Sequence, residues 1–146
     1  MTADLPVDPM RSKIMRSVRQ KKTKPEMLVR RALHGLGYRY KTNVRGLPGS
    51  PDIVFSARQK AIFVHGCFWH RHSGCRLASM PKTRKDFWIE KFNRNVARDA
   101  EKIRELEAMG WEAITIWECE TRNMEKLLPT VVDFLGPSLY GFNVAR

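Results

Sequence analysis

The sequence predicts an α/β fold in which helices flank a mixed β-sheet. Apolar segments of strand length occur at residues 53–55, 61–65 and 112–117, and a long charged helical segment at 84–109 separates the last two of them. A helix between two apolar strands implies a crossover connection and at least one parallel pair of strands, whereas a short turn makes the first two strands antiparallel. A mixed sheet covered by helices follows.

Two helices and a strand are expected before these strands. Residues 8–22 show apolar side chains at helical spacing within a basic segment. Thr23 and Glu26 match a capping box that begins a second helix, and Gly37 ends it. Residues 38–42 alternate in character, which predicts a further strand.

Asp52 follows a turn-rich segment at residues 46–51 and stands at the head of an apolar strand. An irregular loop is expected at 66–83, and a last amphipathic helix near 123–135. The expected element order is α-α-β-β-β-α-β-α. We expect a single domain with a basic helical arm and a C-terminal tail, with these boundaries: 1–146 for the domain, 1–22 for the arm and 137–146 for the tail.

The chain is strongly basic, with 27 Lys plus Arg against 15 Asp plus Glu and a formal net charge of +12. This balance indicates a polyanionic partner, and nucleic acid is favoured over a basic surface that serves only solvation. No apolar run approaches the ~20 residues that cross a membrane, so no membrane partner is expected. The N-terminus shows no export signal, which predicts a cytoplasmic protein.

Cysteine and histidine residues gather in one short segment. The chain has three cysteines, an odd number that argues against a disulfide framework. Three of the four histidines and two of the three cysteines lie between residues 65 and 75. Zinc favours four sulfur or nitrogen ligands, and the closed, structural site that we predict has these ligands: Cys67, His72, Cys75 and Cys119. The alternative is a set of ordinary thiols and surface imidazoles.

Three other polar residues are candidates for phosphodiester chemistry. Asp52 can hold Mg²⁺ at the head of its strand, although an aspartate after a proline often only caps a turn. His70 is left out of the zinc site, and a neutral imidazole can accept a proton from water. Asp99 is a candidate for orienting this imidazole, and the alternative for Asp99 is a surface salt bridge with a neighbouring arginine.

Aromatic residues lie among the basic ones. Phe68 and Trp69 are consecutive, so regular structure cannot turn both toward one core, and Trp88 stands early in the long helix. Aromatic side chains in a basic loop suit wedging between bases, which costs least where pairing is defective. Core packing is the alternative for Phe68 and Trp69, and Phe87 is assigned to the core.

Several motifs together resemble the very short patch repair (Vsr) endonucleases. The run HGCFWH at residues 65–70, combined with WEC at 117–119, is the most specific of them. The likeness covers about residues 10–135. The other runs that carry it are MRSKIMR at 10–16, LPGSPDI at 47–53, FV at 63–64, FW at 87–88 and NVARD at 95–99.

The resemblance implies a restriction-endonuclease-like α/β core and Mg²⁺-dependent hydrolysis of a phosphodiester. The implied substrate is double-stranded DNA with a T:G mismatch, which arises when 5-methylcytosine deaminates. The implied reaction nicks one strand on the 5′ side of the T. A monomer is expected, with assistance from other mismatch-repair proteins.

The resemblance also implies roles for individual residues. Asp52 matches the metal-binding aspartate, and Val64 stands where well-known members have threonine, a change without consequence if its backbone carbonyl binds Mg²⁺. His70 matches the general base and Asp99 the residue that orients it. The other matches are His65 and Glu26 in the active site, Cys67, His72, Cys75 and Cys119 as structural zinc ligands, and Met15, Phe68, Trp69, Trp88 and Asn95 on DNA.

Two other functions stay open at this point. A restriction-type endonuclease would cut both strands of intact duplex. A non-catalytic, zinc-dependent DNA-binding module would process no DNA, and its behaviour would not depend on the carboxylate of Asp52.

Overall fold

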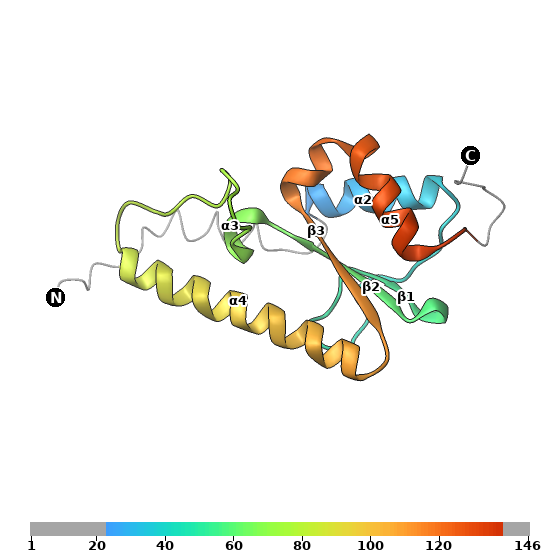
Figure 1. The fold of residues 1–146 in the computed structure, drawn as a ribbon, viewed down its shortest axis with the longest axis horizontal. Helices are drawn as coiled ribbons and strands as arrows, with labels where there is room; N and C mark the ends of the chain where they lie inside the picture. The colour runs from blue at the N-terminus through green and yellow to red at the C-terminus, as the bar shows by residue number, and fades with distance from the viewer. Residues whose placement is uncertain (1–22, 139–146) are drawn as a thin grey trace.

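The computed structural model describes residues 23–138, and three layers make up the fold (Figure 1). The middle layer is a sheet of the strands β1 (Ile53–Phe55), β2 (Lys60–His65) and β3 (Glu112–Trp117), in the order β1-β2-β3. β1 pairs with β2 antiparallel, and β2 pairs with β3 parallel along its whole length. The predicted mixed sheet is therefore confirmed.

Helices α2 (Lys24–Gly35) and α5 (Met124–Leu135) cover one face of this sheet (Figure 1). α2 begins at Thr23, whose hydroxyl oxygen accepts a hydrogen bond from the Glu26 backbone N–H at 3.4 Å, as the capping box predicts. The first turn of the helix accommodates Pro25, because a backbone N–H at this position would have no partner within the helix. The main core lies between helices and sheet, and its buried side chains include Val29, Leu33, Ile53, Ile62, Ile116, Leu127 and Val131.

Helix α4 (Lys85–Ala108) covers the opposite face (Figure 1). Because side chains alternate along a strand, β2 turns Ile62 toward the main core, whereas Ala61 and Phe63 pack with Leu106 of α4 in a second core. The connection from β2 through α4 to β3 is the crossover that the sequence predicts.

Helix α3 (Cys67–His70) is a single turn between β2 and α4. It ends at Arg71, which adopts a left-handed conformation with φ 57°. The residues of this turn pack against the N-terminal half of α4, and a third apolar cluster joins Trp69, Trp88 and Phe92, with Phe68 packed against it. No helix among residues 23–138 is long and apolar enough to span a membrane.

Several expectations from the sequence need correction or fall outside the described residues. The strand expected at 38–42 is reduced to one antiparallel bridge between Lys41 and Val54. The loop at 66–83 is not wholly irregular, because it begins with α3. Phe87 is not a core residue, since 38% of its surface is exposed. The helix expected at 8–22, which includes Met15, lies outside the described residues, as do residues 139–146 of the tail.

The expectation that Phe68 and Trp69 cannot face one core was wrong. A single helical turn places Phe68 and Trp69 edge to face, with ring centroids 5.3 Å apart. Both rings then reach α4: Phe68 lies 5.2 Å from Phe92, and Trp69 lies 6.0 Å from Trp88. The expectation failed because it assumed the alternation of a strand rather than a short helix.

Candidate active site and metal-ligand cluster

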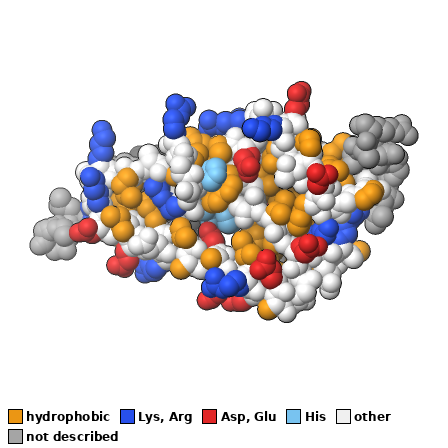
Figure 2. Space-filling model, in the orientation of Figure 1, with side chains coloured by type: hydrophobic (Ala, Val, Ile, Leu, Met, Phe, Trp, Pro, Cys, Tyr) orange, Lys and Arg blue, Asp and Glu red, His pale blue; other side chains and the backbone are white. Residues whose placement is uncertain are grey.

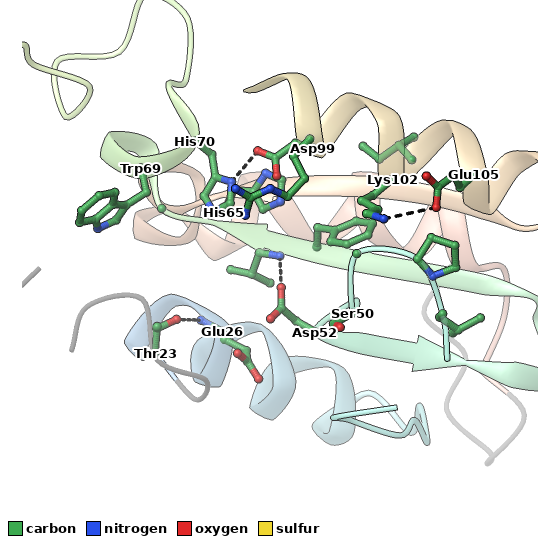
Figure 3. A pocket seen from close by; sticks show the side chains of 18 of the residues that line it. Thr23, Glu26, Ser50, Asp52, His65, Trp69, His70, Asp99, Lys102 and Glu105 are labelled. Atoms are coloured by element: carbon green, nitrogen blue, oxygen red, sulfur yellow. Dashed lines mark hydrogen bonds and ion pairs between the residues drawn. The ribbon is translucent and has the colours of Figure 1, made fainter. Parts of the chain in front are cut away.

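A pocket of about 870 Å³ opens at the edge of the sheet where β1 begins and β2 ends (Figure 3). Because the two strands run antiparallel, the start of one lies beside the end of the other. Six segments line the pocket: the first turn of α2, the turn at 46–52, the end of β2, α3, the C-terminal half of α4 and Glu118 after β3. Histidine side chains reach the surface near the middle of one face of the molecule (Figure 2).

Asp52 is held in this pocket by the backbone of β2. Its N–H donates to the Ile62 carbonyl at 3.1 Å, and its carboxylate Oδ2 accepts from the Val64 N–H at 2.7 Å. A backbone N–H therefore holds the Asp52 carboxylate in place. A hydrogen bond to a charged acceptor is stronger than one between neutral groups. The alternative that Asp52 merely caps its own turn does not describe this geometry, because its bond crosses to the neighbouring strand.

His70 and Asp99 line the same pocket from the α4 side (Figure 3). The His70 Nδ1 lies 2.6 Å from the Asp99 Oδ2, a short and direct hydrogen bond. Because the carboxylate accepts at Nδ1, the neutral imidazole carries its proton there and leaves Nε2 as an acceptor. The arrangement is that of a general base with an orienting carboxylate.

His65, at the end of β2, stacks on His70 with ring centroids 3.8 Å apart and planes inclined by 7°. Burial, followed by repulsion from His70, lowers the pKa of His65 to about 4, and Asp99 opposes this shift. His65 is therefore neutral at physiological pH. The uncharged ring packs flat against His70 and limits its rotation.

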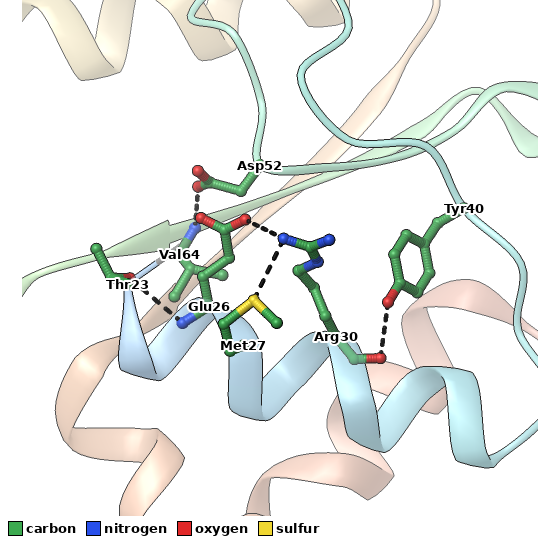
Figure 4. Close-up of polar contacts among 7 residues, drawn as sticks. All are labelled: Thr23, Glu26, Met27, Arg30, Tyr40, Asp52 and Val64. Carbon is green, nitrogen blue, oxygen red and sulfur yellow. Dashed lines mark hydrogen bonds and ion pairs between the residues drawn. The ribbon is translucent and has the colours of Figure 1, made fainter. Parts of the chain in front are cut away.

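Glu26 reaches the pocket from the first turn of α2, with only 3% of its surface exposed (Figure 4). Its Oε2 accepts from the Arg30 guanidinium at 3.3 Å, one helical turn farther on. Arg30 was missed at the sequence level, although its spacing of four residues from Glu26 is the usual signal for such a pair. The Tyr40 hydroxyl donates to the Arg30 carbonyl at 2.9 Å and secures this turn.

Two basic residues of α4, Arg98 and Lys102, also line the pocket and were not singled out from the sequence. The turn that carries Asp52 approaches α4 closely here, because Gly49 has no side chain. A Cβ added to Gly49 would lie 2.9 Å from the Lys102 Cβ and 3.0 Å from the Phe63 ring, and Gly49 also adopts a φ of 77°. Glycine at this position therefore allows the Asp52 turn to dock on α4.

The four predicted zinc ligands lie close together at the start of α3 and in the loop that follows it, next to the end of β3. One ligand atom from each of Cys67, His72, Cys75 and Cys119 lies within 4.8 Å of the others. The Cys119 Sγ lies 3.4 Å from the His72 Nδ1, and the His72 ring stacks on Trp117 at 4.3 Å. The chemistry and spacing of this donor set fit a tetrahedral metal site, and it joins the loop after β2 to the end of β3.

The thiols of this cluster differ in their tendency to ionise. Burial raises the pKa of the Cys67 thiol to about 12 and raises that of Cys119 as well. The pKa of Cys75 is lowered to about 7, chiefly by a hydrogen bond from the Leu77 backbone. Buried thiols of this kind form thiolates when a cation compensates their charge, so a metal bound here would be coupled to deprotonation of the thiols.

Among the described residues predicted to contact DNA, Trp69 lines the pocket, and the other three contact Trp69: Phe68, Trp88 and Asn95. Trp69 and Trp88 are 6% and 5% exposed, so their rings lie within the aromatic cluster, and Phe68 is half-buried beside them. Asn95 donates through Nδ2 to the Trp69 carbonyl at 3.2 Å, which ties α4 to α3. Phe68 is the most exposed of the three aromatic side chains, so it can pack on the cluster and still contact DNA.

Comparison with known proteins decides which family shares this arrangement. Residues 3–76 match the family model described as DNA mismatch endonuclease Vsr. The chain is 41% identical over 125 residues to the DNA mismatch endonuclease Vsr of Escherichia coli, an alignment that covers 86% of this chain and 80% of the relative. The chain belongs to the Vsr family of DNA mismatch endonucleases.

Two further relatives carry the name of nicking enzymes. The type II nicking enzyme V.XorIIP of Xanthomonas oryzae is 46% identical over 86% of this chain and 91% of its own length. The type II nicking enzyme V.NmeAIP of Neisseria meningitidis is 45% identical over 77% of this chain and 80% of its own length. The family resemblance predicted from the motifs is thereby confirmed, and this Vsr-family chain is a DNA endonuclease.

Proposed function

We propose that this Vsr-family endonuclease nicks one strand of duplex DNA on the 5′ side of the T in a T:G mismatch, by Mg²⁺-dependent hydrolysis in very short patch repair. The observation that carries the proposal is the convergence of Asp52 and the His70–Asp99 pair on one pocket, from opposite sides of β2 (Figure 3). A hydrolytic site needs both an anionic ligand and a base within reach of one phosphate.

The residues around Asp52 fit a hard cation that prefers oxygen ligands. The carboxylate of Asp52 lies at the edge of β2 to which Ile62 and Val64 direct their backbone polar groups, because alternate residues of a strand point to the same edge. The Val64 carbonyl therefore faces this edge as the second proposed ligand, and valine serves as well as threonine. Bound Mg²⁺ supplies charge relief at the phosphorus and the leaving oxygen.

His70 would then activate the attacking water. Its Nε2 accepts a proton from the water while Asp99 stabilises the resulting charge through Nδ1. His65 keeps the ring in place by stacking. Glu26, held by Arg30, contributes a second carboxylate to the far wall of the pocket. This carboxylate can accept hydrogen bonds from water molecules that surround the cation.

We also propose that Cys67, His72, Cys75 and Cys119 hold one structural zinc ion and that the fold is a restriction-endonuclease-like core in one domain. The closed set of sulfur and nitrogen donors supports zinc, and the mixed sheet between α4 and the α2–α5 pair supports the fold. Phe68, beside Trp69 and Trp88, is the proposed wedge at the mismatch.

The experiment compares labelled duplexes that hold T:G or T:A at one position, over a randomised flank, with and without Mg²⁺. The proposal predicts a nick 5′ to the T in the T:G duplex alone, and only with Mg²⁺. Equal cutting of both duplexes, or cutting of neither across all flanks, contradicts it. Supercoiled plasmid that carries a T:G mismatch should yield nicked circles, and linear product would favour a restriction-type enzyme.

A further inference from the structure

A row of basic side chains runs along α4 beside the catalytic pair. Arg94, Arg98 and Lys102 are spaced by four residues, and each step of four advances about 6 Å along a helix while turning only about 40°. The three side chains therefore share one longitudinal stripe. Asp99, which holds His70, lies at the border of this stripe.

Two adjoining cavities place the stripe relative to the catalytic pair. A second cavity of about 240 Å³ is lined by Arg94, Arg98 and Asn95 together with His70 and Asp99. Lys102 lines the large pocket on the other side, and Arg98 lines both. The stripe thus passes the catalytic pair, with Arg94 on one side of it and Lys102 on the other.

The carboxylates beside these cations do not prevent an exchange for phosphate. Arg94 pairs with Glu90 at 3.7 Å, with 66% and 73% of the side chains exposed, and Lys102 pairs with Glu105 at 3.5 Å, with 37% and 44% exposed. Surface pairs of this kind contribute little stability and are screened by salt. A DNA phosphate can replace the glutamate at either position.

We infer that Arg94, Arg98 and Lys102 bind successive backbone phosphates of the strand that is nicked, with Arg98 at the scissile phosphate. This assignment rests on the proposed function and extends it to the direction of the strand. The aromatic cluster lies toward the N-terminal end of α4, next to the second cavity. If the mismatched T lies there, Arg94 binds the phosphate on the 3′ side of the cut and Lys102 binds the phosphate on its 5′ side.

The test measures dissociation constants for T:G duplexes without divalent cation, in which one phosphate at a time is replaced by an uncharged methylphosphonate. Arg94→Met and Lys102→Met are compared with Arg104→Met. Arg104 is an exposed cation on the same helix, turned by about 200° from Lys102. All three variants lose one charge.

Lys102→Met and Arg94→Met should each weaken binding of the unmodified duplex roughly three- to tenfold and reduce the salt slope by about 0.9. Arg104→Met should change neither. A methylphosphonate on the 5′ side of the cut should weaken DNA binding by the wild type but not by Lys102→Met. A methylphosphonate on the 3′ side should weaken DNA binding by the wild type but not by Arg94→Met. Equal losses at every position, or an equal loss for Arg104→Met, would overturn the inference.

Failure of this inference is distinguishable from failure of the proposed function. Positions are defined relative to the T, and binding is measured without cleavage. An enzyme that nicks T:G duplexes but lacks the pairwise pattern overturns the strand assignment alone. One that shows the pattern but nicks no T:G duplex overturns the proposed reaction alone.

Discussion

The metal-ligand cluster and the candidate catalytic pocket share helix α3 but are assembled in different ways. Three of the four cluster ligands lie within nine consecutive residues, and only Cys119 comes from elsewhere. The pocket is assembled from six segments between Thr23 and Glu118. Cys67 and His70, three positions apart in one turn of helix, face the two different sites. A metal ion bound by the cluster would fix this turn and with it the position of His70 in the pocket.

This difference predicts that stability depends mainly on the cluster and chemistry mainly on the pocket. Loss of a cluster ligand should first lower stability, and activity only as a consequence. Loss of a pocket residue should lower activity and leave the fold intact. The following predictions test this separation.

The largest effect is expected for Asp52→Asn. Loss of the anionic ligand should slow nicking of a T:G duplex roughly 10³-fold or more, since a bound metal contributes several kcal/mol to charge stabilisation. The amide oxygen still accepts from the Val64 N–H, so the melting temperature should change little. Single-turnover rates and thermal denaturation measure both. A variant that nicks at the wild-type rate would place the chemistry elsewhere.

Cys119→Ser should have the opposite signature. Loss of the ligand that joins β3 to the loop should lower bound zinc from one ion per chain and lower stability by about 3 kcal/mol, roughly 10 °C in melting temperature. Elemental analysis and thermal denaturation provide the measurements. Ser73→Ala, at an exposed position of the same loop, is the control. Full zinc content and unchanged melting in Cys119→Ser would refute the cluster as a metal site.

Asp99→Asn should slow nicking about 10²-fold, a smaller loss than that of Asp52→Asn, because the imidazole remains but loses its anionic partner. The affinity for T:G duplex without divalent cation should stay within about twofold of the wild type, since Asp99 repels rather than attracts phosphate. Rates and binding are measured on the same duplex. If Asp99→Asn lowered only the affinity for DNA and not the nicking rate, Asp99 would form a surface salt bridge and would not orient His70.

The smallest effect is expected for Phe87→Ala, since 38% of this side chain is exposed. Unfolding free energy should fall by less than about 1 kcal/mol. Its neighbour Trp88, 5% exposed within the aromatic cluster, is the matched comparison, and Trp88→Ala should cost about 3–5 kcal/mol. Chemical denaturation measures both. Equal losses would mean that Phe87 packs as a core residue after all.

The sequence predicted the cluster better than the pocket for a physical reason. Soft ligands crowded into one short segment are unusual enough to indicate a metal, and Cys119 directly follows a predicted strand. Asp52 had no such signal, since an aspartate after a proline commonly caps a turn. Its proposed role depends on the register of β1 against β2, which places its carboxylate on the Val64 N–H, and register is a tertiary property.

The remaining errors have similar causes. Residues 38–42 alternate as a strand does, yet they form only one bridge, because β1 is three residues long and offers little edge for pairing. The assignment of Phe87 to the core was wrong because the phase of α4 turns Trp88 and Phe92 inward and leaves Phe87 at the surface. Helix phase and strand length are set by packing partners that lie far away in the sequence.

The central claim is that Asp52 and His70 act on the same phosphate, and a double-variant comparison tests it most directly. Single-turnover nicking of one T:G duplex is measured for Asp52→Asn, His70→Ala and the combined variant. Groups that act as one unit show strongly non-additive losses, so the combined variant should be about as slow as the slower single variant. If the two losses instead multiply, the two residues act independently and the account is contradicted.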